Sequence, residues 1–470
     1  MYSRASAPVV FKMKRILILL ILSTSILVFN GCGVIIRGIE SGFRGLSNIF
    51  NPTRSGIITA EELGWARTAW KYFENNYNAS TGLVNTSDSY QSTTMWGVGD
   101  YLLALVSAHE LEIIDRKTFD QRVSQVFGFL NYMPLYDNKL PAVSYNTATG
   151  KSDLTGWSGQ DLGRLLIALK IVREHYPQYG EYIDRAVLRW NWCDVVDTAG
   201  NINSGYRGAK GTVIIQDAKL GFKEYAARGF QAWGFKTSAA TSPDPYDVLK
   251  INGVDIYFDG RDERKDNSIN AVVSLPYILD GLEFQWMSAG YCQRSDYIVA
   301  DTRLRQMAES VYRVQEKRYE IDKVLTARTS HNIVAEPYFV YDAIFANGYN
   351  WNTVTSQNKN MPQAALVSTK AAFGMWVLWR TNYTDQLISV INTLFDAKRG
   401  WYEGRSEITG KAETALTLST NAMVLESLLF KKNGMIYRLS NADETFYDKA
   451  LQNEFKNRGK CINQKESSCQ

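Results

Sequence analysis

Beyond residue 58, apolar residues recur mostly at helical spacing, as in Leu162, Leu165 and Leu169. Thr59, followed three residues later by Glu62, predicts a capping box at the start of the first helix. Strand-like runs are few and short, so the pattern predicts an all-α fold. Helices are predicted at 59–77, 94–111, 115–133, 158–176, 179–196, 216–234, 274–288, 294–319, 365–380, 383–396 and 414–433, with a further stretch at 442–457.

The connections between these helices alternate in length. Short ones are predicted near 112–114, 177–178, 289–293 and 381–382, and long ones near 78–93, 134–157, 197–215, 320–364 and 397–413. The alternation fails between 235 and 273. It is restored if Pro245 to Ile251 form a short helix, which makes 252–273 a sixth long connection and twelve the number of helices.

The helices also alternate in character. Every second one is apolar on nearly all sides and rich in small residues, as in TMWGVGDYLLAL, GWSGQDLGRLLIAL and LSTNAMVLESLLF. A helix that is apolar all round is buried, and an amphipathic helix covers it. The pattern therefore predicts an (α/α)6 toroid of six helical hairpins, with inner and outer rings and the long loops on one face. Such loops often carry function.

The N-terminus is typical of an export signal. Lys14 and Arg15 precede an apolar run from Ile16 to Phe29 that is short for a membrane span, and Gly31-Cys32 follows. We interpret 1–32 as a lipoprotein signal peptide ending at a lipidated Cys32; the alternative is an uncleaved anchor helix. Both place the protein outside the cytoplasm, in the bacterial cell envelope. The predicted units that follow are a flexible tether at 33–58, the toroid at 59–434, and a C-terminal helix and polar tail at 435–470.

Charge and cysteine content bear on three features: nucleic-acid binding, disulfides and metal sites. The formal charge of +4 comes from four basic residues before Cys32, where no acid occurs, so nucleic acid is not a predicted partner. An oxidising compartment allows disulfides. Cys461 and Cys469 are close enough in sequence to close a small loop, and Cys193 could simply be buried. With three His and no CxxC spacing, no metal or cofactor is predicted.

The inner helices all begin at the predicted loop-bearing face, so carboxylates and aromatic residues near their starts converge on one cavity. Asp161, three residues after Ser158, is equally consistent with half of a helix cap. Asp280 and Glu283 lie deeper in their helix and are interpreted as partners of Arg residues. The residues near the helix starts are Trp96, Asp100, Trp157, Asp161, Asp217 and Glu224.

A Gly-rich segment before the last toroid helix combines carboxylates with aromatic side chains: Trp401, Tyr402, Glu403 and Glu407. Sugar hydrolysis needs two carboxyl groups, and sugar rings pack on flat aromatic faces. The alternative is a solvated turn with a salt bridge to Arg405.

A second loop cluster contains Asp259 and Arg261, which either grip a hydroxyl-rich ligand or form a fixed internal pair. Aromatic residues spread over the loops suggest a sugar-binding platform. These are Tyr90, Tyr145, Trp157, Tyr206, Trp351 and Trp401.

The segments TMWGVGDYLLAL, KEYAARGFQAWGF, YILDGLEF, PYFVYD, STKAAFG and RGWYEGRSE resemble a largely uncharacterised bacterial family with a glucoamylase-like toroid, over roughly 59–434. The resemblance implies a six-hairpin, glycosidase-like domain. Several acidic positions of the family pattern differ here. They read Asp217 to Glu224, Ser274-Leu275-Pro276 and Ser330-His331-Asn332, whereas the region of Glu403 and Glu407 looks retained.

Two hypotheses follow. In the first, an exported glycoside hydrolase-like lipoprotein acts on an envelope or extracellular polysaccharide. Glu403 or Glu407 supplies one catalytic carboxyl, and Asp217, Glu224 or Asp161 the opposing one. The sugar-binding residues are Tyr90, Trp96, Asp100, Trp157, Asp259, Arg261, Trp401 and Tyr402. In the second, a non-catalytic lipoprotein binds glycans or serves polysaccharide assembly.

Overall fold

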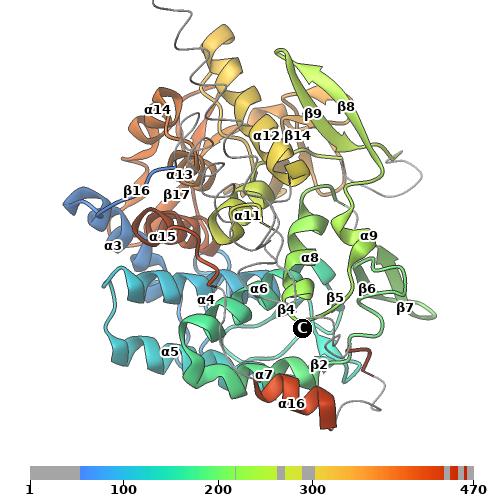
Figure 1. Cartoon of the computed structure of the whole chain (residues 1–470). Coiled ribbons are helices and arrows are strands. Elements are labelled where there is room, and N and C mark those ends of the chain that lie inside the picture. Colours follow the sequence, from blue (N-terminus) through green and yellow to red (C-terminus); the bar gives the residue numbers. More distant parts are fainter. Residues whose placement is uncertain are drawn as a thin grey trace, which may run out of the picture. The chain divides into compact units, whose positions relative to one another are not determined.

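The computed structural model describes residues 53–216, 219–261, 270–287, 302–438, 445–453 and 460–462 (Figure 1). The chain divides into a unit at 1–52 and a unit at 53–470, and all the described residues belong to the second. The signal peptide with Cys32, most of the tether, Asp217, Cys292 and Cys469 lie outside the described residues. Within the described ranges, no helix combines the length and apolar character that crossing a membrane requires.

Most of the predicted helices are present, and the capping box at the first one is confirmed: Thr59 Oγ1 accepts from the Glu62 N–H at 3.2 Å. The longer helices are α3 (Ala60–Asn75), α4 (Met95–Glu110), α5 (Arg116–Tyr132), α6 (Gly159–His175), α7 (Gly180–Arg189), α8 (Phe222–Ala232), α11 (Leu275–Phe284), α12 (Thr302–Asp322), α13 (Thr369–Leu378), α14 (Asn382–Ile391), α15 (Leu418–Asn433) and α16 (Phe446–Asn453). The short ones are η1 (Pro177–Tyr179), α9 (Ser238–Thr241) and η2 (Pro362–Ala364).

Six buried helices contact one another in a closed series: α4, α6, α8, α11, α13 and α15, with α15 returning to α4. Five of these helices have the sequences read as apolar on nearly all sides, whereas α8 also carries Lys223, Glu224 and Arg228. Small residues let their backbones approach closely. A Cβ on Gly163 of α6 would lie 2.6 Å from the Cβ of Ala226 in α8, so only glycine fits there.

The remaining helices of the toroid region cover this series, one for each buried helix. Helix α3 packs on α15, α5 on α4, α7 on α6, α9 on α8, α12 on α11, and α14 on α13. The predicted alternation of covering and buried helices is therefore confirmed for the described residues. Figure 1 shows α16, in red, beside α7.

The long connections contain the described strands, so the all-α prediction is wrong for these segments. The connections are the first (76–94), second (133–158), third (190–221), fourth (242–274), fifth (323–368) and sixth (392–417). Their strands are β1 (Thr93–Thr94), β2 (Leu135–Tyr136), β3 (Leu140–Pro141), β4 (Ser144–Tyr145), β5 (Gly156–Trp157), β6 (Asn203–Gly208), β7 (Gly211–Gln216), β8 (Tyr246–Ile251), β9 (Val254–Asp259), β10 (Ser330–Asn332), β11 (Phe339–Asp342), β12 (Phe345–Ala346), β13 (Tyr349–Asn350), β14 (Thr353–Thr355), β15 (Leu366–Ser368), β16 (Phe395–Asp396), β17 (Gly400–Ser406) and β18 (Ala412–Leu416).

Strands of neighbouring connections pair with one another, which gathers the connections at one end of the buried helices. Strand β1 pairs with β4, β5 with β6, and β15 with β17, all antiparallel. Bridges join Ser87 to Thr417 and Val272 to Phe345. Each connection leads directly into a buried helix. The starts of these helices therefore lie beneath the paired strands, as the functional hypotheses require.

The helix predicted at 245–251 is wrong, because this segment is strand β8, paired with β9. The two strands are joined by Asn252 and Gly253, both at positive φ (48° and 80°). Asn-Gly between apolar runs is a strong signal for a two-residue hairpin, and here it prevails over the helix expected from the alternation of connections. The four-residue helix α9 takes the place of a covering helix on α8.

Candidate functional site

The first turn of α8 carries a buried carboxyl group, that of Glu224. Its Oε2 accepts the Gly221 N–H at 2.6 Å, and the Lys223 Nζ lies 3.4 Å from its Oε1. Lys223 also donates to the Ser242 carbonyl oxygen at 2.6 Å, so its charge is shared. Burial is the main cause that raises the pKa of Glu224 to about 7, against the lowering effect of Lys223. This carboxyl group is therefore partly protonated at neutral pH.

Asp161 occupies the corresponding position of the neighbouring helix α6. Its N–H donates to Ser158 Oγ at 3.1 Å, and the Ser158 hydroxyl donates to its Oδ1 at 2.9 Å. These bonds form the helix cap, which was one of the two interpretations of Asp161 from the sequence. Unlike Glu224, Asp161 is only half-buried.

The two helices hold these carboxyl-bearing turns at the same level. Both helices follow strands of one sheet, β5 before α6 and β6–β7 before α8, so they start from the same end. Gly163 meets Ala226 at the close approach of α6 and α8. Asp161 and Glu224 each lie two residues before that contact. The structure thus places two of the five predicted catalytic carboxyls in the first turns of adjacent buried helices.

Trp96, in the first turn of α4, lies beside the same turn of α8. Its ring centroid is 5.9 Å from those of Phe222 and Tyr225, which flank Glu224 in α8. The Trp96 side chain is half-buried. Trp96, a predicted sugar-binding residue, thus contacts the turn of α8 that carries Glu224.

Below this level, Arg164 binds carboxylates from three other buried helices. Its Nε donates to Asp100 at 2.8 Å, its Nη2 to Glu426 at 2.9 Å, and its Nη1 to Glu283. Tyr225 Oη also accepts from Nη1, at 2.6 Å. All of these side chains are buried, and burial raises the pKa of each carboxyl group despite Arg164. Asp100, predicted to bind sugar, is thus enclosed in a buried ionic cluster.

Asp280 and Glu283 were interpreted as partners of Arg residues, and this is confirmed. Asp280 pairs with Arg228 at 3.2 Å, and Glu283 pairs with Arg164. Arg164 itself was missed. A basic residue inside the otherwise apolar run GRLLIAL was the signal that could have indicated a buried ionic cluster.

Glu403 is fully buried in β17. Its Oε1 accepts from Thr420 Oγ1 at 2.9 Å and from Thr417 Oγ1, and its Oε2 lies 3.3 Å from Lys370 Nζ. Thr417 and Thr420 belong to the N-terminal cap of α15, so Glu403 is placed at the start of a buried helix as predicted. Its charge is held by Lys370.

Glu407 is held by two arginines. Arg328 donates to it from Nε at 3.0 Å and from Nη2 at 2.6 Å, and Arg318 Nη1 donates at 3.1 Å. Arg328 also lies 3.2 Å from Asp342. The alternative expectation of a salt bridge to Arg405 is wrong, because Arg318 and Arg328 take that role among the described residues.

The described residues contain no group of three or more His, Cys, Asp or Glu side chains arranged to hold a metal ion. A cavity of about 640 Å³ lies at the turn between α4 and α5, where these helices meet at the end opposite the long connections. It contains none of the predicted site residues.

Comparison with known proteins places the chain in a family. Residues 64–434 match the family described as "Protein of unknown function (DUF3131)". The chain belongs to this family. No curated protein matches this DUF3131 protein.

Solved structures share its fold at low sequence identity. A protein named as a candidate glucoamylase from Bacteroides caccae is 12% identical, with a TM-score of 0.58, covering 81% of this chain and 95% of that one. An endo-β-1,2-glucanase from Chitinophaga pinensis, in complex with sophorotriose and glucose, is 11% identical, with a TM-score of 0.58 and coverages of 82% and 95%. The endo-β-1,2-glucanase from Talaromyces funiculosus, with sophorose, is 10% identical, with a TM-score of 0.50 and coverages of 84% and 86%. The resemblance to an uncharacterised glucoamylase-like family is thus confirmed.

The other predicted aromatic residues of the DUF3131 protein divide by burial. Trp401 is fully buried against Phe373 and Phe395, and Trp157 is 3% exposed. Tyr145 is buried and Tyr402 half-buried, whereas Tyr90 is 67% and Tyr206 48% exposed. Only the last two present much aromatic surface to solvent.

Asp259 and Arg261 form a fixed internal pair, which was one of the two alternatives from the sequence. Arg261 Nε donates to Asp259 Oδ1 at 2.9 Å, and the Arg261 backbone N–H donates to the same oxygen at 3.1 Å. Asp259 is 2% exposed. The carboxylate is therefore satisfied within the fourth connection.

Proposed function

We propose that this DUF3131 protein is an exported, lipid-anchored glycoside hydrolase-like protein that cleaves a bacterial polysaccharide. Its buried and covering helices form the predicted toroid of six hairpins, which the closed series of helix contacts supports. The fold is shared with structures named as endo-β-1,2-glucanases.

One observation carries the proposal: Glu224, at the start of a buried helix, has a pKa raised to about 7 by burial. Glycoside hydrolysis needs a carboxylic acid that keeps its proton until it is delivered to the leaving oxygen. In this proposal Glu224 is that general acid, and release of its proton sets the alkaline limit of activity.

Asp161 is the proposed second carboxyl group. It lies level with Glu224 on the adjacent helix, and its partial exposure lets it contact water. Burial keeps one carboxyl group protonated as the acid, and partial solvation keeps the other ionised as the base or nucleophile. Asp161 acts on the water or on the sugar carbon, while Glu224 protonates the departing oxygen. Trp96 supplies the aromatic face for the ring between them.

The proposed substrate class is a β-linked glucan, with β-1,2-glucan as the first candidate. It rests on the fold shared with the two endo-β-1,2-glucanases. The exposed Tyr90 and Tyr206, in the first and third connections, offer further surfaces for sugar rings.

The proposed location is the cell envelope, with the lipid on Cys32 and the domain joined to it by the tether. The disulfide between Cys193 and Cys461 supports this location, because such bonds persist in oxidising compartments.

The test is a screen of bacterial glucans and envelope polysaccharides with the wild type, Glu224→Gln and Asp161→Asn. Removal of either carboxyl group should lower the rate of cleavage by at least a hundredfold. Both variants should still unfold cooperatively on heating, which shows that they are folded. Glu181→Gln is the matched control, since Glu181 is exposed and its ion-pair partner among the described residues is Arg185, also in α7. Undiminished turnover by Glu224→Gln would end the assignment of the acid.

The second candidate is a non-catalytic glycan-binding lipoprotein. The observation that favours it is that Glu403 and Glu407, in the segment that looked retained, are each neutralised by cations. Binding of a glucan in calorimetry without any product, equally for the wild type and Glu224→Gln, would establish this role.

A further inference from the structure

The C-terminal segment is attached to the domain at two places, of which α16 is the first. Tyr447 is 2% exposed, and its N–H donates to Asp184 Oδ2 in α7 at 3.0 Å. Its hydroxyl donates to the carbonyl oxygen of Trp233, directly after α8, at 3.0 Å, and the two rings meet edge to face at 5.0 Å. Helix α16 thus ties α7 to the C-terminal end of α8.

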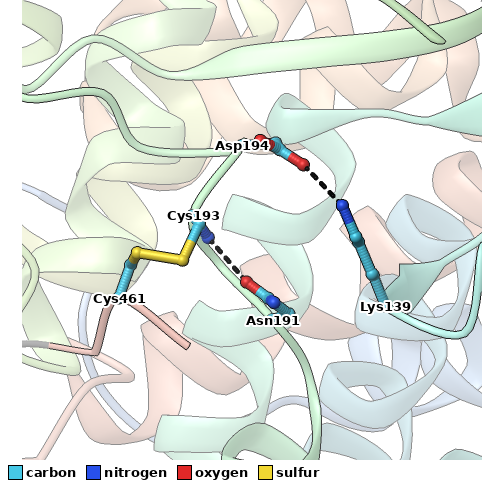
Figure 2. Close-up of a disulfide and its surroundings, with 5 residues drawn as sticks. All are labelled: Lys139, Asn191, Cys193, Asp194 and Cys461. Carbon is cyan, nitrogen blue, oxygen red and sulfur yellow. Dashed lines mark hydrogen bonds and ion pairs between the residues drawn. A yellow bond between two sulfur atoms is a disulfide. The ribbon is translucent and has the colours of Figure 1, made fainter. Parts of the chain in front are cut away.

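The second attachment lies at the start of the third connection. Cys461 forms a disulfide with Cys193 (Figure 2). Of the possibilities that the sequence left open, neither a loop closed by Cys461 and Cys469 nor a Cys193 that is merely buried agrees with this pairing. Lys460 Nζ donates to the carbonyl oxygens of Leu188 and Arg189 at 2.8 and 3.0 Å, which closes the end of α7.

The same point also holds the second connection. The N–H of Asn191 donates to the Lys139 carbonyl oxygen at 3.0 Å, and Lys139 Nζ lies 3.3 Å from Asp194 (Figure 2). The Cys193 N–H donates to Asn191 Oδ1 at 3.0 Å. The disulfide is therefore surrounded by bonds between two long connections.

These two connections lead into the two helices of the proposed acid and base. The second runs through β5 to α6 and Asp161, and the third runs through the β6–β7 hairpin to α8 and Glu224. The C-terminal segment grips the stretch from 192 to 233 at both ends, at Cys193 and at Trp233. The contacts of the C-terminal segment thus hold both ends of the stretch of chain that contains Glu224.

We propose that the Cys193–Cys461 disulfide is a redox latch that brings the Asp161–Glu224 site into its working geometry only after oxidation outside the cytoplasm. This rests on the proposed function. In the latching step the two thiols lose their protons and a sulfur–sulfur bond forms. The two electrons pass to an external protein or small-molecule disulfide, which becomes two thiols.

Without the disulfide, residues 460–462 are held by the non-covalent contacts of a short segment, including the hydrogen bonds of Lys460 and the packing of Ile462 against the core. Such short segments open locally. The third connection then loses its anchor at Cys193, and water reaches the first turn of α8. Since burial is what raises the pKa of Glu224, hydration lowers it. The alkaline limit of activity then moves to lower pH, a change that a general loss of stability does not produce.

The experiment compares the full-length wild type with Cys193→Ser/Cys461→Ser, by hydrogen exchange and by the pH profile of glucan cleavage. The expected result is exchange about tenfold faster over 190–216 and unchanged over 369–433, with the alkaline limb displaced to lower pH. Cys469→Ser is the control for loss of a thiol. Dithiothreitol should reproduce the effect in the folded wild type and add nothing to the double variant, so the test does not depend on that variant folding.

Equal exchange over 190–216 in the oxidised and reduced wild type would overturn the latch. So would an increase of the same size over the whole domain, which indicates general destabilisation. If the wild type cleaves no glucan, the proposed function fails, and hydrogen exchange still shows whether the disulfide controls the third connection.

Discussion

Asp161 and Glu224 occupy the third position of two adjacent buried helices, α6 and α8, each two residues before the glycine–alanine contact that joins them. Asp161 is half-buried and Glu224 is enclosed. One local geometry therefore produces two different carboxyl environments.

The close approach of α6 and α8 should be sensitive to a single methyl group. Gly163→Ala places a Cβ against the backbone of Ala226, and overpacking of this kind costs roughly 1–3 kcal/mol. Because the change moves Asp161 relative to Glu224, the rate of cleavage should fall more than glucan binding does. Gly128→Ala in α5 is the matched control, since its Cβ meets nothing within 4 Å and alanine favours a helix by up to about 1 kcal/mol. Chemical denaturation measures the loss of stability, and steady-state kinetics measures the loss of cleavage rate. Equal kinetics for Gly163→Ala and Gly128→Ala would contradict the prediction.

Glu224 should make the stability of the protein depend on pH. Its pKa in the folded state is about 7, above the ordinary value of an unfolded Glu, so the folded state binds the extra proton. The contribution is present at acidic pH, is lost as the pH rises through 7, and levels off above it. The quantity to compare is the free energy of unfolding of Glu224→Gln minus that of the wild type. This difference should be larger at pH 8 than at pH 4 by on the order of 3 kcal/mol. Urea denaturation at the two pH values measures this, and the same difference at both would refute it.

Removing Arg164 should be severe. Arg164→Met leaves Asp100, Glu283 and Glu426 buried without their cation, and breaking such a cluster typically costs roughly 3–5 kcal/mol. The exposed Arg185 provides the control: Arg185→Met removes an i,i+4 surface pair worth up to about 0.5 kcal/mol, and a cation–π contact with Phe446 worth about 0.5–1 kcal/mol. Thermal unfolding of both variants decides the matter, and a small effect of Arg164→Met would show that the carboxyl groups are neutral and satisfied without it.

Glu407 should matter for stability rather than for chemistry, against its role in the sequence-based hypothesis. Glu407→Gln leaves Arg318 without its carboxylate and Arg328 with Asp342 alone, and the expected loss is roughly 3 kcal/mol. The turnover number per folded molecule should stay within a factor of about two, since a shift below 0.5 kcal/mol changes a rate no more than this. The turnover number of Glu407→Gln, measured at a temperature well below that of unfolding, tests this prediction. A loss of turnover without a loss of stability would restore Glu407 as a catalytic group.

The sequence by itself determined the helices and their order. Burial periodicity, the caps at Thr59 and Ser158, and the alternation of apolar and amphipathic segments act over a few residues, so they can be read along the chain. The same signals located Glu224 and Asp161 at helix starts. Asn252-Gly253 is a local signal of the same kind, for the hairpin of β8 and β9.

Only the tertiary structure decided which charges and cysteines meet. Arg164 and Glu426 are separated by 262 residues, Arg328 and Glu407 by 79, and Cys193 and Cys461 by 268. These pairs form because the series of buried helices closes on itself, which brings α4 and α15 together and sets the long connections side by side. Local periodicity shows that a side chain faces inward, whereas the partner it finds there depends on that closure.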